Sequence, residues 1–179
     1  MDINTPIVFS DGTYVFNKLK QDYISHKKGR FILAASGTGK SYYVSNQKAK
    51  HWIDGDYYWH ITNADLLPEE WVHDMEVVME VNNRSDVMTQ QAIKQGLWIV
   101  GSSNNWLRPD AIVILDEETH RKYINKRENT EYDGGAKDED FEAVKRHTEV
   151  IKRWSDKGVP VFNSIELAAT HFIDLESKV

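Results

Sequence analysis

The sequence predicts an α/β fold, with a five-stranded parallel sheet flanked by helices in three layers and an N-terminal hairpin and helix preceding it. Short apolar runs alternate along the chain with longer stretches that lack proline and glycine and can form helices. Strands that are apolar throughout are typical of a parallel sheet buried on both faces. One such run, residues 31–35, leads through a short glycine-containing loop into a helical stretch, which makes a strand–loop–helix unit.

The length of the chain predicts one domain over residues 1–179, because 179 residues fill one core and are too few for two comfortable ones. We expect a core over residues 30–179 and an N-terminal extension over residues 1–29. The extension is predicted to form a hairpin of residues 7–9 and 14–16 around Asp11-Gly12, and then a helix over about 17–26.

The elements of the core follow from apolar runs bounded by glycine or other turn residues. The strands are expected at 31–35, 51–54, 97–100, 111–115 and 158–162, and the helices at 40–50, 68–95 with a break near Asn82-Asn83, 118–127, 139–156 and after Ser164, which can cap the last one. The acidic stretch 128–140 contains Gly134-Gly135 and predicts a mobile loop.

The composition is that of a soluble globular protein, with 40% hydrophobic and 28% charged residues. No apolar run approaches the roughly 20 residues of a membrane span, and the N-terminus lacks a secretory signal, so we expect a cytoplasmic protein without a membrane partner. The absence of cysteine excludes disulfides, thiolate metal sites and a cysteine nucleophile. A net charge of −6 disfavours broad electrostatic binding to nucleic acid.

Residues 34–41, Ala-Ala-Ser-Gly-Thr-Gly-Lys-Ser, form the most informative motif, a relaxed phosphate-binding loop with Ala34 in place of the usual first glycine. Gly37 and Gly39 can take backbone angles that turn successive N–H groups inward as an anion nest, to which Lys40 and the following helix add positive charge. We therefore expect ATP and Mg²⁺ as cofactors, with Ser41 as a Mg²⁺ ligand. The expected nucleotide-binding residues are Ser36, Gly37, Thr38, Gly39, Lys40 and Ser41.

A second motif, the apolar run 111–115 followed by Asp116-Glu117-Glu118, has two interpretations. It matches a Walker B strand, in which Asp116 would hold Mg²⁺ and Glu117 would activate water in a P-loop ATPase. It also matches a buried strand followed by a helix that Asp116 caps. The chain that follows is short for a motor ATPase, and this favours the structural interpretation.

In these motifs the chain resembles the small P-loop kinases of the nucleoside monophosphate kinase type, a group that includes shikimate- and gluconate-kinase-like enzymes. The resemblance rests on the loop, on Asp54-Gly55-Asp56 after the second strand, on residues 96–101, and on the fourth strand followed by arginines. It implies a P-loop fold, a lid region over about 118–146 and catalytic roles for Lys40, Asp54, Asp56, Arg121, Arg127 and Arg146. It implies further that Asp54 or Asp56 orients the acceptor and that Asp54 is a possible Mg²⁺ ligand. The aromatic residues that follow, Tyr57, Tyr58 and Trp59, either stack a base or sugar or belong to the core.

The chain departs from these kinases where Ser102-Ser103-Asn104-Asn105 replaces the arginine that often follows the third strand, which favours a hydroxyl acceptor. The leading hypothesis is transfer of the ATP γ-phosphate to a nucleoside, a nucleotide or a nucleic-acid-derived hydroxyl or phosphate. The alternatives are a P-loop ATPase or nucleotide switch, a sugar or shikimate-like kinase, and a non-enzymatic nucleotide-binding module. In its small size and its many aromatic residues the chain is also similar to virus-encoded nucleotide-modifying kinases. A kinase of that kind would act in the host cytoplasm.

Overall fold

The structure, a computed structural model, describes residues 7–8, 14–15, 22–56, 66–67, 71–128 and 135–178. The chain forms two compact units. The first unit comprises residues 1–31 and 47–108, and the second comprises residues 32–46 and 109–179.

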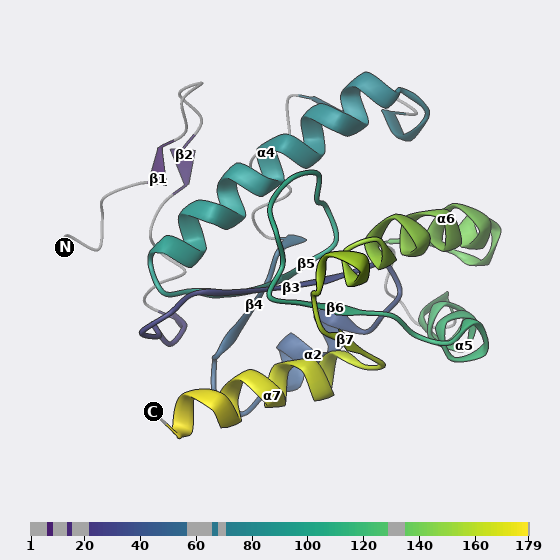
Figure 1. Ribbon diagram of the computed structural model, residues 1–179. Coiled ribbons are helices and arrows are strands. Elements are labelled where there is room, and N and C mark those ends of the chain that lie inside the picture. The colour runs from purple at the N-terminus through teal and green to yellow at the C-terminus, as the bar shows by residue number, and fades with distance from the viewer. Residues whose placement is uncertain are drawn as a thin grey trace. The chain divides into compact units, whose positions relative to one another are not determined.

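Five strands form a parallel sheet in the order β4-β5-β3-β6-β7 (Figure 1). Their bounds are Arg30–Ala34 for β3, Trp52–Asp54 for β4, Trp98–Gly101 for β5, Ala111–Val113 for β6 and Val161–Phe162 for β7. Strands β3 to β6 are buried at nearly every residue, as expected for a parallel sheet covered by helices. The α/β class and the five parallel strands predicted from the sequence are therefore confirmed.

In the first unit, β4 and β5 pair in register, with Trp52 opposite Trp98 and Asp54 opposite Val100. Helix α4, Met75–Lys94, packs on β5 after the short 3₁₀ helix η1, Trp71–His73, and is visible along its whole length in Figure 1. The Asp74 carboxylate caps α4 by accepting hydrogen bonds from the amides of Glu76 and Val77.

In the second unit, β6 pairs in parallel with β3 and with β7, with Leu33 opposite Ile112 and Ile112 opposite Val161. Helix α7, Ile165–Ser177, packs on β6, β7 and α2, which spans Lys40–Asn46. The Ser164 hydroxyl accepts a hydrogen bond from the Leu167 amide at 3.1 Å, so the predicted cap of the last helix is confirmed. The other helices are α5, Glu117–Glu128, and α6, Phe141–Lys152, with the 3₁₀ helices η2, Asp138–Asp140, and η3, Ser155–Lys157.

Three predicted helices end elsewhere. Residues 23–26 are not helical, because the Ile24 and His26 amides bond to the carbonyls of Lys50 and Gly96 instead of to a helix. Helix α2 ends at Asn46, since the Gln47 side chain exchanges two hydrogen bonds with the backbone of Trp52. The helix predicted over 139–156 is shorter, ending at Lys152 before η3.

The break predicted in α4 near Asn82-Asn83 is wrong. The helix continues through this point because the Asn83 side chain does not compete for its own backbone; its carbonyl oxygen accepts from the Asn105 side chain at 2.7 Å.

The predicted N-terminal hairpin is confirmed in its strands, β1 Ile7–Val8 and β2 Tyr14–Val15, which pair antiparallel. The turn at Asp11-Gly12 and most of the helix predicted after it lie outside the described residues. Over the described ranges, no helix combines the length and the apolar character needed to cross a membrane.

Two left-handed glycines allow a matched test of packing. Gly96 and Gly158 have φ of 79° and 74°, but a Cβ atom at Gly96 would overlap the His26 carbonyl oxygen, whereas a Cβ at Gly158 would meet nothing within 4 Å. We expect Gly158→Ala to lower the free energy of unfolding by roughly 1–2 kcal/mol, the cost of a left-handed L-residue, and Gly96→Ala to lower it by clearly more. Urea unfolding of both variants measures the difference, and equal losses would contradict the packing described at Gly96.

Candidate functional site

The loop that follows β3 has the backbone of an anion nest. It runs from Ala35 to Gly39, and α2 begins at Lys40. Gly37 and Gly39 have φ of 80° and 91°, a backbone conformation that residues other than glycine rarely adopt. Left-handed residues alternating with right-handed ones turn successive amides toward one concave side, and such a surface binds anions.

Two side chains of the loop bond to the same carbonyl. The Thr38 hydroxyl donates to the Ala35 oxygen at 2.8 Å, and the Lys40 ammonium donates to it at 3.0 Å. Lys40 is 6% exposed, so its positive charge is held within the loop and largely removed from water. A cation in this position interacts with an incoming anion more strongly than a solvated one would.

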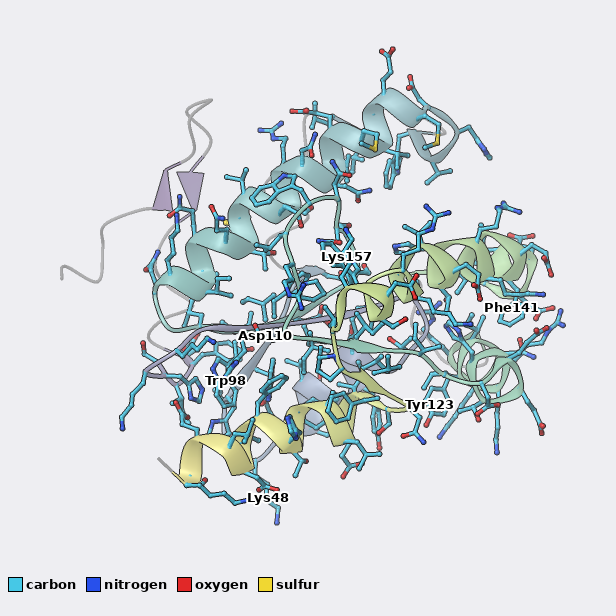
Figure 2. All side chains as sticks on the ribbon, in the orientation of Figure 1. Lys48, Trp98, Asp110, Tyr123, Phe141 and Lys157 are labelled. Atoms are coloured by element: carbon cyan, nitrogen blue, oxygen red, sulfur yellow. The ribbon has the colours of Figure 1, made fainter. Side chains whose placement is uncertain are left out.

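Helix α5 lies against the loop. The His120 Nε2 atom is 2.7 Å from the Ser36 carbonyl oxygen, and a Cβ atom at Gly37 would lie 2.5 Å from the Ile124 side chain. A Cβ at Gly39 would lie 3.8 Å from the ring of Tyr123, which is labelled on α5 in Figure 2. Glycine at position 37 is therefore required both by its backbone angle and by the helix beside it.

The environment of His120 keeps it neutral. Burial lowers the pKa of His120, and the positive charges of Lys40 and Arg127 lower it further, against the opposing effect of the Ser36 carbonyl. Because a carbonyl oxygen only accepts, the neutral ring carries its proton on Nε2 and donates it to Ser36. The ring also meets Phe141 edge to face, with centroids 6.0 Å apart.

Asp116 and Glu117 occupy the positions of a helix cap. The Asp116 carboxylate accepts from the Thr119 amide at 2.8 Å, and this bond lowers the pKa of Asp116. The Glu117 carboxylate, at the first residue of α5, is exposed and pairs with Lys145 at 3.5 Å. This is the arrangement that the structural interpretation of the second motif predicts.

The three candidate arginines are placed differently. Arg121 is exposed, pairs with Asp138 at 2.9 Å and lies over the Phe141 ring. Arg146 is exposed on α6. Arg127 donates to the Ala136 carbonyl, and the Ala136 amide in turn donates to the Ser36 hydroxyl at 3.3 Å. Of the three, Arg127 is thus the one that hydrogen bonds through Ala136 connect to the loop.

The first unit holds the two aspartates predicted to face an acceptor. Asp54 is 5% exposed, and its carboxylate accepts from the Asp56 amide at 3.1 Å. The Gly55 amide donates to the Val100 carbonyl at 2.7 Å, and a Cβ at Gly55 would lie 3.0 Å from the Gly101 backbone. A side chain at position 55 would therefore require the ends of β4 and β5 to move apart by a few tenths of an ångström.

A small open hollow lies at these strand ends. Its described lining carries four hydroxyls and one carboxylate but no lysine or arginine. The lining residues are Gly55, Asp56, Ser85, Thr89, Gly101, Ser102 and Ser103. Such a lining offers hydrogen bonds to hydroxyl groups rather than charge neutralisation for a phosphate.

Asp86 holds the segment that follows the hollow. This carboxylate is fully buried and accepts from the Asn104 side chain and from the amides of Asn105, Trp106 and Leu107, at 2.6 to 3.0 Å. The unusual Ser-Ser-Asn-Asn segment thus continues into a loop whose shape Asp86 fixes.

The second unit brings together the loop after β3 and α5, and the first unit brings together Asp56, the hydroxyls of the hollow and, behind them, Asp86. Tyr57, Tyr58 and Trp59 lie outside the described residues, as does most of the predicted mobile loop, residues 129–134.

Sequence reasoning missed His120 and Asp86. The signal for Asp86 was an acidic residue within the apolar pattern of α4; for His120 no local signal exists, because its partner lies on the loop.

The residues of the loop fit a nucleotide with Mg²⁺. The nest and Lys40 suit phosphate groups, and the Ser41 hydroxyl follows Lys40 at the start of α2. No group of three or more metal-ligating side chains occurs among the described residues. Mg²⁺ in proteins usually keeps several water ligands and takes the others from one or two side chains and from substrate phosphates.

No model of a known protein family matches the chain, and no curated protein matches its sequence.

Replacing Asp86 tests its role in fixing the loop. In Asp86→Asn an amide NH₂ faces backbone donors, so we expect the free energy of unfolding to fall by about 2 kcal/mol, the range for hydrogen bonds to a charged group. The control Asn105→Ala removes only an exposed bond to Asn83 and should change stability by less than about 0.5 kcal/mol. Chemical unfolding compares the two, and similar small effects would show that Asp86 does not hold the loop.

The lowered pKa of His120 makes stability depend on pH. The unfolded chain binds a proton at His120 below about pH 6.5, whereas the folded protein binds it only at lower pH. The contribution is therefore present above about pH 6.5 and is lost as the pH falls from there through the folded-state pKa. We expect wild-type protein to lose more stability than His120→Gln between pH 7.5 and 5, measured by urea unfolding. Parallel curves for the two proteins would contradict a lowered pKa.

Proposed function

We propose that the protein is an ATP-dependent kinase with a P-loop fold that transfers the γ-phosphate to a nucleoside, a nucleotide or a similar small acceptor. The observation that carries the proposal is the loop after β3, where left-handed Gly37 and Gly39 flank Thr38 and the ammonium of Lys40 is buried beside them. A glycine nest with a buried lysine suits the phosphates of a nucleotide.

The strand order supports a ligand at this loop. The chain leaves β3 for β4 and leaves β6 for β7, and these destinations lie on opposite sides of the β3–β6 pair. In open α/β sheets, ligands bind beyond the carboxyl ends of the strands where the connections diverge in this way. The phosphate loop follows β3, and Asp116 follows β6.

In the proposed kinase the loop amides and Lys40 hold the β- and γ-phosphates of ATP, and Ser41 ligates Mg²⁺, which neutralises charge on the transferred group. Arg127, held near the loop through Ala136, is the arginine best placed to contribute further positive charge. Arg121 and Arg146 would neutralise charge on the transferred phosphoryl group only after a rearrangement of the lid region over 118–146. A protein that uses ATP in this way would work in the cytoplasm.

The acceptor side of the proposal rests on Asp56. Asp54 is buried, and its carboxylate accepts a hydrogen bond from the Asp56 amide. Asp56 lines the hollow together with the hydroxyl groups. We therefore assign Asp56 as the group that orients or deprotonates an acceptor hydroxyl, and Asp54 as the group that shapes the turn. The lack of cations in the described lining favours an unphosphorylated acceptor, such as a nucleoside or a sugar-like metabolite.

A P-loop ATPase is the second candidate, with Asp116 and Glu117 as its Walker B pair. The capping bond from Thr119 to Asp116 and the exposed ion pair of Glu117 with Lys145 count against it. A water-activating glutamate would be expected to face the phosphates, not the solvent.

The deciding experiment is a coupled assay of ADP release with deoxynucleosides, nucleoside monophosphates, DNA ends and sugars as acceptors. A kinase gives ADP release that depends on one acceptor class. An ATPase gives release without any acceptor, and a binding module gives none while ATP still binds.

Substitutions then separate the roles. We expect Lys40→Ala to weaken ATP binding by about tenfold or more, which corresponds to about 1.4 kcal/mol.

Asp56→Asn should lower kcat by about 100-fold or more with ATP affinity retained, since it removes a proton acceptor. Glu117→Gln should leave turnover intact. Loss of turnover in Glu117→Gln together with full activity of Asp56→Asn would favour the ATPase, and unchanged ATP binding by Lys40→Ala would exclude both candidates.

A further inference from the structure

We propose that His120 is a positioning residue of the phosphate loop, which aims the Gly37 amide into the anion nest by holding the Ser36 carbonyl. The inference rests on the proposed role of the loop in nucleotide binding and adds a residue from α5 to it. No motif in the sequence assigns His120 such a role.

The argument starts from the peptide unit that joins Ser36 and Gly37. The Ser36 carbonyl and the Gly37 N–H belong to one planar trans peptide and point in opposite directions. The Ser36 oxygen lies 2.7 Å from His120 Nε2. The Gly37 N–H therefore points away from the imidazole, as an amide of the nest requires.

The orientation of the Ser36–Gly37 peptide must be fixed by a contact from another part of the chain. Glycine populates both signs of φ with similar ease, so the peptide before Gly37 can rotate at little steric cost. A rotated peptide would present a carbonyl oxygen to the phosphates in place of an N–H, which removes a donor and adds repulsion. The hydrogen bond from His120 favours the orientation that binds anions.

His120 is itself well fixed. It is 3% exposed, its ring meets Phe141 edge to face, and its amide bonds to the Asp116 carbonyl at 2.9 Å. Ser36 is also held from a second direction, because its hydroxyl accepts from the Ala136 amide at 3.3 Å. The two contacts hold the carbonyl and the side chain of one loop residue at the same time.

Two substitutions separate the hydrogen bond from the packing. In His120→Gln the side-chain amide nitrogen is the same number of bonds from the backbone as Nε2 and can still donate. In His120→Leu the volume is largely kept and the donor is lost. His171→Leu, on the exposed face of α7, controls for the loss of an imidazole.

The test measures binding of ADP and of inorganic triphosphate by calorimetry, with thermal unfolding to verify that each variant folds. We expect His120→Leu to weaken both ligands by about tenfold or more, or about 1.4 kcal/mol, and His120→Gln to stay within about threefold of wild type. Equal affinities of wild type and His120→Leu, or equal losses in both variants, would overturn the proposal.

A second measurement uses the unaltered protein without nucleotide. Nitrogen-15 spectra should show His120 as the Nε2–H tautomer, and the Gly37 amide resonance should move in His120→Leu but not in His171→Leu. An Nδ1–H tautomer would overturn the proposal even if His120→Leu does not fold. If wild-type protein binds neither ADP nor triphosphate, the proposed nucleotide site fails, whereas the tautomer and the Gly37 resonance still report on the His120 contact.

Discussion

The turn from β3 into α2 constrains the second unit more than any other feature. The chain reverses from a buried strand into a helix within five residues, and it does so with left-handed backbone at Gly37 and Gly39. Amides that point to one side leave carbonyls that point to the other, and these need donors. Thr38 and Lys40 supply donors to Ala35, and His120 supplies one to Ser36. Helix α5 therefore lies on the carbonyl side of the nest, where His120 supplies the donor that the Ser36 oxygen needs.

The first unit meets a similar need with a single carboxylate. The segment after β5 has successive amides without strand or helix partners, and Asp86 accepts from three of them. A buried carboxylate is stable there because its hydrogen bonds replace the water it has lost. The same contacts fix the loop that follows Ser102 and Ser103, so the shape of the hollow depends on a residue that does not line it.

Much of the fold follows from local patterns in the sequence. The five apolar runs became the five strands, four of them buried along nearly their whole length and β7 at the more exposed edge of the sheet, and the capping serine at position 164 began its helix as expected. The errors lie where hydrogen bonds to other parts of the chain, from a side chain or from the backbone, replace those of a helix. Gln47 ends α2 by bonding to Trp52, and residues 23–26 bond to Lys50 and Gly96, partners that no helical periodicity reveals.

The candidate site was predictable to a similar extent. Gly37, Gly39 and Lys40 are recognisable because their chemistry is encoded within eight consecutive residues. The cap at Asp116 was one of two interpretations, and the bond from Thr119 agrees with the structural one. The partners of His120 and Asp86 could not be assigned from the sequence, since each side chain acts on a loop that is distant along the chain and only the fold brings the two together.

The contact between Gly37 and Ile124 has a consequence for how this sequence can change over time. A side chain at position 37 would collide with Ile124, so a larger residue there becomes acceptable only after position 124 has become smaller. The left-handed φ of Gly37 narrows the choice further, toward asparagine or aspartate. Positions 37 and 124 are therefore coupled in descent, and position 37 of the loop after β3 can diverge only together with the helix beside it.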